Sequence, residues 1–135
     1  MRIIGLHHVA IATNDVKRHK ELIENLFGLK GGEIHTNEAN KVSLSFVDLF
    51  NADLEFLQPL DRESPIFKFL EKRGPGIHHL CILVDDIEAA LEELHAKGAK
   101  LIDSNPRMGA EGSLIAFIHP ESTGGILIEL KEIKS

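Results

Sequence analysis

An internal repeat is the feature that most narrows what this 135-residue chain can fold into. Residues 5–16 read GLHHVAIATNDV and residues 76–87 read GIHHLCILVDDI, so their second histidines differ by 79 − 8 = 71 positions. The glutamates of DLEFL (53–57) and LIELK (127–131) differ by 129 − 55 = 74 positions. Self-similarity at a fixed spacing predicts two copies of one supersecondary unit that pack against each other.

Each half of the repeat predicts the element order strand, helix, strand, strand, strand. Segments rich in Val, Ile and Leu that are bounded by turn-forming residues are typical of strands. In the first half these segments are Leu6–Thr13, Gly31–Thr36, Val42–Leu49 and Ala52–Leu57. In the second half they are Ile77–Val84, Lys100–Ile102, Ser113–His119 and Gly125–Lys131. The predicted fold class is α+β, with tandem βαβββ modules that form a curved mixed sheet.

Capping residues mark three helices. The expected boundaries are Asn14 and Gly28, then Ser64 (followed by Pro65) and Gly74, then Asp85 (with Glu88 as its capping-box partner) and Gly98. We therefore expect a first module at 1–60, a linking helix at 61–75 and a second module at 76–135, packed as one compact domain.

Each half contains two consecutive histidines, His7-His8 and His78-His79. Because side chains alternate along a strand, one histidine of each dipeptide lies on the face that the module's own helix leaves open. His8 shares that face with Ala10 and Ala12, so we expect this face to curve round a cavity lined by small residues. His79 occupies the equivalent position in the second half. If both point inward, the preceding histidines, His7 and His78, point away from the cavity.

The repeat also contains two glutamates at equivalent positions of its halves. Glu55 and Glu129 each lie inside an apolar segment, where a buried carboxylate is costly unless it is paired or bound to metal. Two modules related by a pseudo-twofold axis would bring His8, Glu55, His79 and Glu129 to one centre. Two imidazoles and two carboxylates suit a divalent ion in octahedral geometry with two open positions.

The other histidines and the cysteine are interpreted as structural. Cys81 is predicted to be a small buried hydrophobic side chain and not a nucleophile. We expect His19, His35 and His95 at the surface, and His119 in a loop.

Composition narrows the classes of partner and compartment. A formal net charge of −6 argues against nucleic acid and anionic membranes as general partners. A single cysteine fits a reducing compartment, and neither a membrane span nor a signal peptide is visible. We therefore expect a cytoplasmic protein.

Taken together, these residues resemble the vicinal-oxygen-chelate (glyoxalase/bleomycin-resistance) superfamily over nearly the whole chain. The stretches SPIFKFLEKRGPGIHHLCILVDDIEAAL and HPESTGGILIEL are especially similar to the methylmalonyl-CoA epimerases within it. The resemblance implies a glyoxalase-like fold around a metal cleft. It also implies one divalent ion per site (cobalt, manganese, nickel or zinc), held by His8, Glu55, His79 and Glu129.

The same resemblance implies epimerisation of methylmalonyl-CoA through a metal-stabilised enolate. Because this reaction needs acid–base groups on both faces of the substrate, Glu129 is the first catalytic candidate and Glu55 the second. Some epimerases carry a further glutamate in the strand that here includes Leu44, and this chain has no glutamate in that strand. The resemblance also implies a homodimer, with the cleft formed either within one chain or across a swapped pair.

Three alternatives stay open at this point. Glyoxalase I (lactoylglutathione lyase) uses the same ligand set but usually carries an Arg where this chain has Ala12. An extradiol dioxygenase would need only two His and one Glu, and a non-catalytic binding protein tends to lose the ligands.

A coenzyme A tail would require basic residues such as Lys41, Lys72, Arg73 and Arg107. The loop at Asn105–Ser113 could close over substrate.

Overall fold

The computed structural model describes residues 1–109 and 111–133, and the chain divides into two compact units. The central unit is His8–His78, and the terminal unit combines Met1–His7 with His79–Ser135. Strands β1 (Ile3–Ala12) and β5 (Gly76–Val84) each begin in one unit and end in the other. No helix among the described residues is long and apolar enough to cross a membrane.

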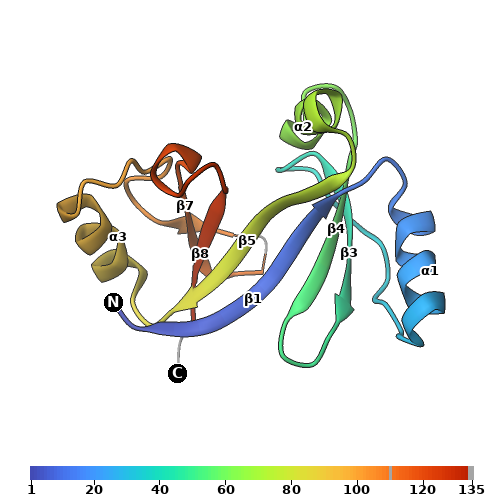
Figure 1. Ribbon diagram of the computed structural model, residues 1–135, viewed down its shortest axis with the longest axis horizontal. Helices are drawn as coiled ribbons and strands as arrows, with labels where there is room; N and C mark the ends of the chain where they lie inside the picture. Colours follow the sequence, from blue (N-terminus) through green and yellow to red (C-terminus); the bar gives the residue numbers. More distant parts are fainter. Residues whose placement is uncertain (110, 134–135) are drawn as a thin grey trace. The chain divides into compact units, whose positions relative to one another are not determined.

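Both halves follow the predicted βαβββ order (Figure 1). After β1 the chain forms α1 (Val16–Phe27), β2 (His35–Asn37), β3 (Val42–Asp48) and β4 (Asp53–Pro59), and then α2 (Pro65–Arg73). After β5 it forms α3 (Ile87–Ala96), β6 (Arg107–Met108), β7 (Leu114–Ile118), the short 3-10 helix η1 (Pro120–Ser122) and β8 (Ile128–Glu132).

The strand order is equivalent in the two halves: β2-β3-β4-β1 in the first and β6-β7-β8-β5 in the second. In each half the first and last strands pair in parallel, and the other pairs are antiparallel. This mixture of parallel and antiparallel pairs, with helices against the strands, confirms the α+β class.

Two predicted strands are wrong in their bounds. Gly31–Thr36 contributes only a single bridge at Gly31, and the edge strand begins at His35. Two consecutive glycines supply no side chain to pack, which weakens a strand at that point. Lys100–Ile102 likewise contributes one bridge, and β6 forms instead after the turn-forming residues 103–106.

The linking helix has the predicted caps, whereas other predicted caps are shifted by one residue. Helix α1 is capped by Asp15 and not by Asn14, and the C-cap of α3 is Lys97, one residue before Gly98. The Ser64 hydroxyl accepts a hydrogen bond from the N–H of Ile66, and Gly74 ends α2. At α3 the N-cap is Asp86, whose carboxylate accepts from the N–H of Ala89. Asp85 instead accepts from the N–H of Arg2, which holds the pKa of the Asp85 carboxyl below its usual value.

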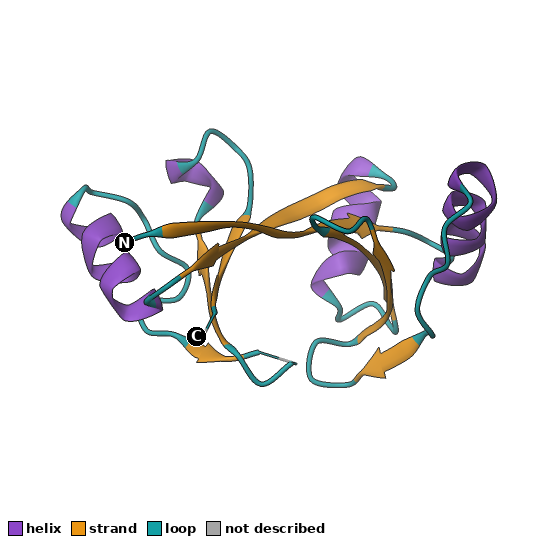
Figure 2. Cartoon of the chain, turned by 90° about the horizontal axis from the view of Figure 1, so that it is seen from below, coloured by secondary structure: helices purple, strands orange, loops and turns teal. Residues whose placement is uncertain are grey.

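Two helices cover opposite faces of the central unit's strands, as Figure 2 shows for the purple helices flanking the orange strands. Helix α1 packs through Val16 on Val47 and Phe56. Helix α2 packs through Ile66 on the other face, against Ala12 of β1. The expectation of an open cavity beside the small residues of β1 is therefore wrong at this end of the strand. The small side chains there make room for a helix.

In the terminal unit α3 covers one face of β5, β7 and β8. Its Leu91 packs in one cluster with Ala116 and Leu130. Because side chains alternate along a strand, the neighbours of Leu130 on β8, Glu129 and Lys131, face the opposite side.

Candidate functional site

The terminal unit contains a buried histidine–glutamate pair. Strands β5 and β8 run parallel, with Cys81 in register with Glu129, so His79 precedes that register position by two residues. The Nε2 atom of His79 lies 3.1 Å from Oε1 of Glu129, and the two side chains are only 7% and 10% exposed. A buried carboxylate is costly unless it is paired with a hydrogen-bond donor or a cation, and here the imidazole is its neighbour.

The central unit contains the equivalent pair. Strands β1 and β4 run parallel with Ala10 in register with Glu55, so His8 again precedes the register position by two residues. The Nε2 atom of His8 lies 3.4 Å from Oε1 of Glu55, and both side chains are largely buried. The sequence repeat is thus preserved as a repeat of side-chain geometry.

Two phenylalanines extend this repeat and were not recognised from the sequence. Phe46 is the antiparallel partner of Glu55, and Phe117 is the antiparallel partner of Glu129. The rings of Phe46 and His8 meet edge to face at 6.1 Å and 76°, and those of Phe117 and His79 at 5.5 Å and 80°. Their spacing, 117 − 46 = 71, equals the histidine offset and could have identified them.

The donor atoms in each pair fit a divalent metal ion. An imidazole Nε2 and a carboxylate oxygen are ligands that cobalt, manganese, nickel and zinc all accept. In each pair the imidazole already directs Nε2 towards the carboxylate, and the neighbouring phenylalanine edge restricts the tilt of the ring. Either pair could supply one nitrogen and one oxygen ligand.

Cys81 is completely buried, as predicted. A ring nitrogen of His7 lies within 4.8 Å of the Cys81 sulfur. His78 packs its ring against Phe69 of α2 at 5.0 Å.

The predicted surface position is right for two of the three histidines assigned there. His35 and His95 are exposed, whereas the half-buried His19 stacks on Phe56 at 4.7 Å, and its burial lowers its pKa. His119 follows β7 and accepts a hydrogen bond at Nδ1 from the N–H of Glu121.

The basic residues considered for a coenzyme A tail mostly have partners of their own. Lys41 pairs with Glu63 at 2.7 Å, and this hydrogen bond raises the Lys41 pKa. Arg107 pairs with Asp103 and also lies over the ring of Phe117 at 5.6 Å. The segment Asn105–Ser113, considered as a loop that could close over substrate, contains β6, which pairs antiparallel with β7; residue 110 within it lies outside the described residues.

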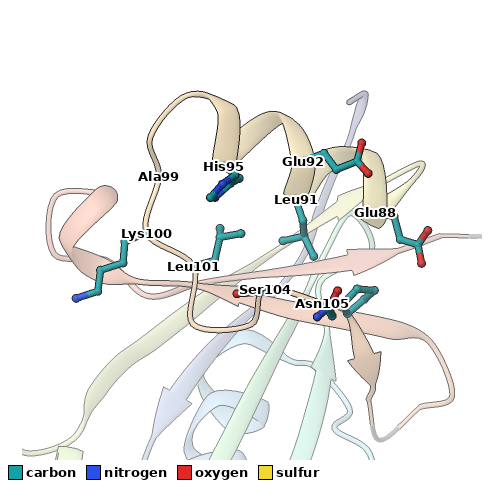
Figure 3. Close-up of a pocket in the computed structure, with 10 residues that line it drawn as sticks. Glu88, Leu91, Glu92, His95, Ala99, Lys100, Leu101, Ser104 and Asn105 are labelled. Carbon is teal, nitrogen blue, oxygen red and sulfur yellow. The ribbon is translucent and has the colours of Figure 1, made fainter.

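A cavity of about 640 Å³ lies elsewhere in the terminal unit, between α3 and the segment 99–106 (Figure 3). Its lining includes Glu88, Leu91 and His95. Leu91 also packs against Leu130, so this cavity is on the α3 side of the strands, opposite Glu129. It is therefore separate from the His79–Glu129 pair.

Comparison with known proteins agrees with this geometry. The model of the glyoxalase/bleomycin resistance protein/dioxygenase superfamily matches residues 7–117. A mitochondrial methylmalonyl-CoA epimerase from Dictyostelium discoideum is 41% identical over 128 residues, which cover 94% of this chain and 77% of that protein.

Solved structures give the same result. A methylmalonyl-CoA epimerase from Mycobacterium tuberculosis matches with a TM-score of 0.89 and 36% identity over 96% of this chain and 88% of that one. A methylmalonyl-CoA epimerase in complex with methylmalonyl-CoA and NH4+ matches with a TM-score of 0.88 and 28% identity over 97% and 95% of the two chains. The glyoxalase-like fold is confirmed, and the chain belongs to the glyoxalase/bleomycin resistance protein/dioxygenase superfamily.

Proposed function

We propose that this protein is a metal-dependent methylmalonyl-CoA epimerase. The observation that carries the proposal is the pair of matching His–Glu contacts, 3.4 Å for His8 and Glu55 and 3.1 Å for His79 and Glu129. Two relatives that match over nearly the whole chain are named methylmalonyl-CoA epimerase. Epimerisation at a carbon next to a thioester needs acid–base groups on two faces and is helped by a cation at the carbonyl oxygen. The two equivalent pairs supply one glutamate each for proton transfer and the ligands that could hold such a cation.

The four residues are proposed to bind one divalent ion together. The repeat supports a shared ion, because each module offers one histidine and one glutamate at equivalent positions, and the four together make the two-imidazole, two-carboxylate set that suits a divalent ion. A bound ion would supply positive charge against the negative charge that develops on the thioester oxygen as the C2 proton leaves. His8 and His79 act as ligands only, since each imidazole is held by a phenylalanine edge and directs Nε2 towards its glutamate.

The glutamates are proposed to move the proton. Glu129 takes the C2 proton from one face, and Glu55, its equivalent, returns a proton to the other face, which inverts the centre. Strand β3 contains no glutamate, and its Leu44 packs in the apolar cluster beneath α2. The second acid–base role therefore falls to Glu55.

The experiment follows deuterium entry at C2 of methylmalonyl-CoA in heavy water. With the two epimers tested separately, we expect Glu129→Gln and Glu55→Gln each to lower exchange by at least a hundredfold for the epimer whose C2 proton faces the altered residue, since each removes the group that transfers that proton. Glu121→Gln is the matched control, because Glu121 is an exposed carboxylate paired with Lys100 on the surface. Undiminished exchange in Glu129→Gln would overturn the catalytic assignment.

One structural observation disfavours glyoxalase I. Ala12, where that enzyme usually carries an arginine, is completely buried beneath α2 and leaves no space for a longer side chain. Incubation with methylglyoxal and glutathione tests the point, and we expect no lactoylglutathione.

Metal analysis of the purified protein separates an enzyme from a ligand-sequestering protein, for which a metal-free but ligand-binding state is expected.

We also propose a homodimer. Ile77 and Leu6, on the two strands that run through both units, are 62% and 40% exposed, which is unusual for large apolar side chains within strands. Sedimentation equilibrium tests the assembly, with a dimer mass expected and a monomer contradicting the proposal. Cytoplasmic location stays a prediction.

A further inference from the structure

A buried lysine lies on the same face of β8 as Glu129. The side chain of Lys131 is only 10% exposed, although lysine is almost never buried without a partner. Leu130, between the two residues, packs into the α3 cluster, so Glu129 and Lys131 both face away from α3. Alternate residues on one strand face are about 6.6 Å apart, within the reach of a lysine side chain.

The counter-charge of Lys131 comes from a surface turn. Its Nζ lies 3.4 Å from Oε1 of Glu111, which is longer than the roughly 2.7–2.9 Å of a charge-assisted hydrogen bond. Glu111 is itself 50% exposed. The ion pair therefore joins a buried ammonium to a carboxylate that water already solvates, and such a loose contact can be exchanged for a ligand's carboxylate.

The turn that presents Glu111 is held against the neighbouring strand. There is too little space for a side chain at residue 109, because a Cβ on Gly109 would lie only 2.9 Å from Cγ2 of Ile115. Ile115 is the register partner of Lys131 across β7 and β8. The glycine thus lets the turn approach the strand at the residue opposite Lys131.

We propose that Lys131 is a specificity-determining residue that binds the free carboxylate of a 2-carboxyacyl thioester. The inference rests on the proposed function, in which C2 of that acyl group lies beside Glu129. The carboxylate is one bond from C2, so a side chain on the same strand face as Glu129 is within reach of it. On binding, it replaces Glu111 as the partner of the ammonium, and an acyl thioester without this carboxylate gains nothing from Lys131.

The test compares two ligands that differ only in the carboxylate. Calorimetric titration of the Co²⁺-loaded protein with racemic methylmalonyl-CoA and with propionyl-CoA gives two dissociation constants. We expect Lys131→Met to weaken methylmalonyl-CoA binding by about tenfold or more and to change propionyl-CoA binding by less than about threefold. Lys97→Met is the matched control: Lys97 pairs with Glu93 on α3, so we expect neither constant to change.

A second variant, at Glu111, tests whether the substrate carboxylate replaces Glu111 as the partner of Lys131. Glu111→Gln removes the competing carboxylate without touching Lys131, so methylmalonyl-CoA should bind about threefold or more tightly while propionyl-CoA binding stays constant. This variant alters an exposed turn and carries the test even if Lys131→Met does not fold.

Two results overturn the inference. If Lys131→Met weakens both ligands equally, Lys131 contacts the coenzyme and not the acyl carboxylate. If neither variant changes the ratio of the two dissociation constants, Lys131 is only structural. Failure of the proposed function looks different: the unaltered protein would show no deuterium exchange, whatever the binding ratio.

Discussion

The Nε2 atom of His79 and Oε1 of Glu129 lie 3.1 Å apart across two parallel strands, and the sheet register fixes this relation. The histidine precedes the register partner of the glutamate by two residues. His8 and Glu55 repeat the offset in the other half. Since strand pairing and not a flexible loop sets the distance, the pair is held ready before any ligand arrives.

Phe117→Leu should weaken metal binding by about tenfold, because the lost ring edge no longer restricts the tilt of the His79 imidazole. Competition with a chromophoric chelator for Co²⁺ measures the affinity. Phe67→Leu is the control, since that ring packs under Arg62 and not against a histidine of either pair. Equal affinities of Phe117→Leu and the unaltered protein would show that the ring does not position the ligand.

Ala12→Leu should destabilise the fold by about 1–3 kcal/mol. Ala12 is completely buried beneath Ile66 of α2, so added carbon atoms have to displace the helix. Urea denaturation measures the free energy of unfolding. Leu22→Ala, on the exposed side of α1, should change it by less than about 0.5 kcal/mol. A neutral effect of Ala12→Leu would mean that α2 does not seal this face.

His19 should make stability depend on pH below about 6.5. Its burial against Phe56 lowers its pKa, so the folded protein binds fewer protons there than the unfolded chain. The stabilising contribution is fully present above the unfolded value of about 6.5 and is lost as the pH falls through the lowered folded value.

Unfolding experiments at pH 7.5 and 5.5 measure this dependence. The unaltered protein should lose more stability between the two values than His19→Gln does. His35→Gln, at an exposed position, should keep the full dependence. Parallel curves for the unaltered protein and His19→Gln would contradict the assignment.

Phe50→Gly should stabilise the protein by about 0.5–1 kcal/mol. Phe50 has φ 74° in the turn between β3 and β4, a region that a side chain with a Cβ adopts at a cost, and its ring is 89% exposed. Glycine removes the strain and loses almost no buried surface. Thermal unfolding measures the effect. A fall in the melting temperature would show that the added flexibility of the unfolded chain outweighs the strain.

The sequence by itself determined the repeated architecture and the four residues of the two pairs. Hydrophobic runs and the repeat, with its offsets of 71 and 74 positions, can be read from the chain alone. The caps Ser64 and Gly74 satisfy the backbone groups at the ends of a helix wherever that helix packs. The same local evidence failed at Gly31–Thr36 and Lys100–Ile102. Edge strands there depend on which neighbour is available for pairing, and the sequence does not encode that locally.

Only the tertiary structure decided what surrounds the pairs. Phe46 and Phe117 meet the imidazoles edge to face, and α2 covers Ala12. Both arrangements depend on contacts between elements distant in the chain. Lys131 is the clearest case of a residue whose surroundings cannot be predicted from the sequence. As the last residue of LIELK, it looks like an ordinary charged residue at the end of a strand. Its burial beside Glu129 follows only from the register of β8 with β7 and from the turn that carries Glu111.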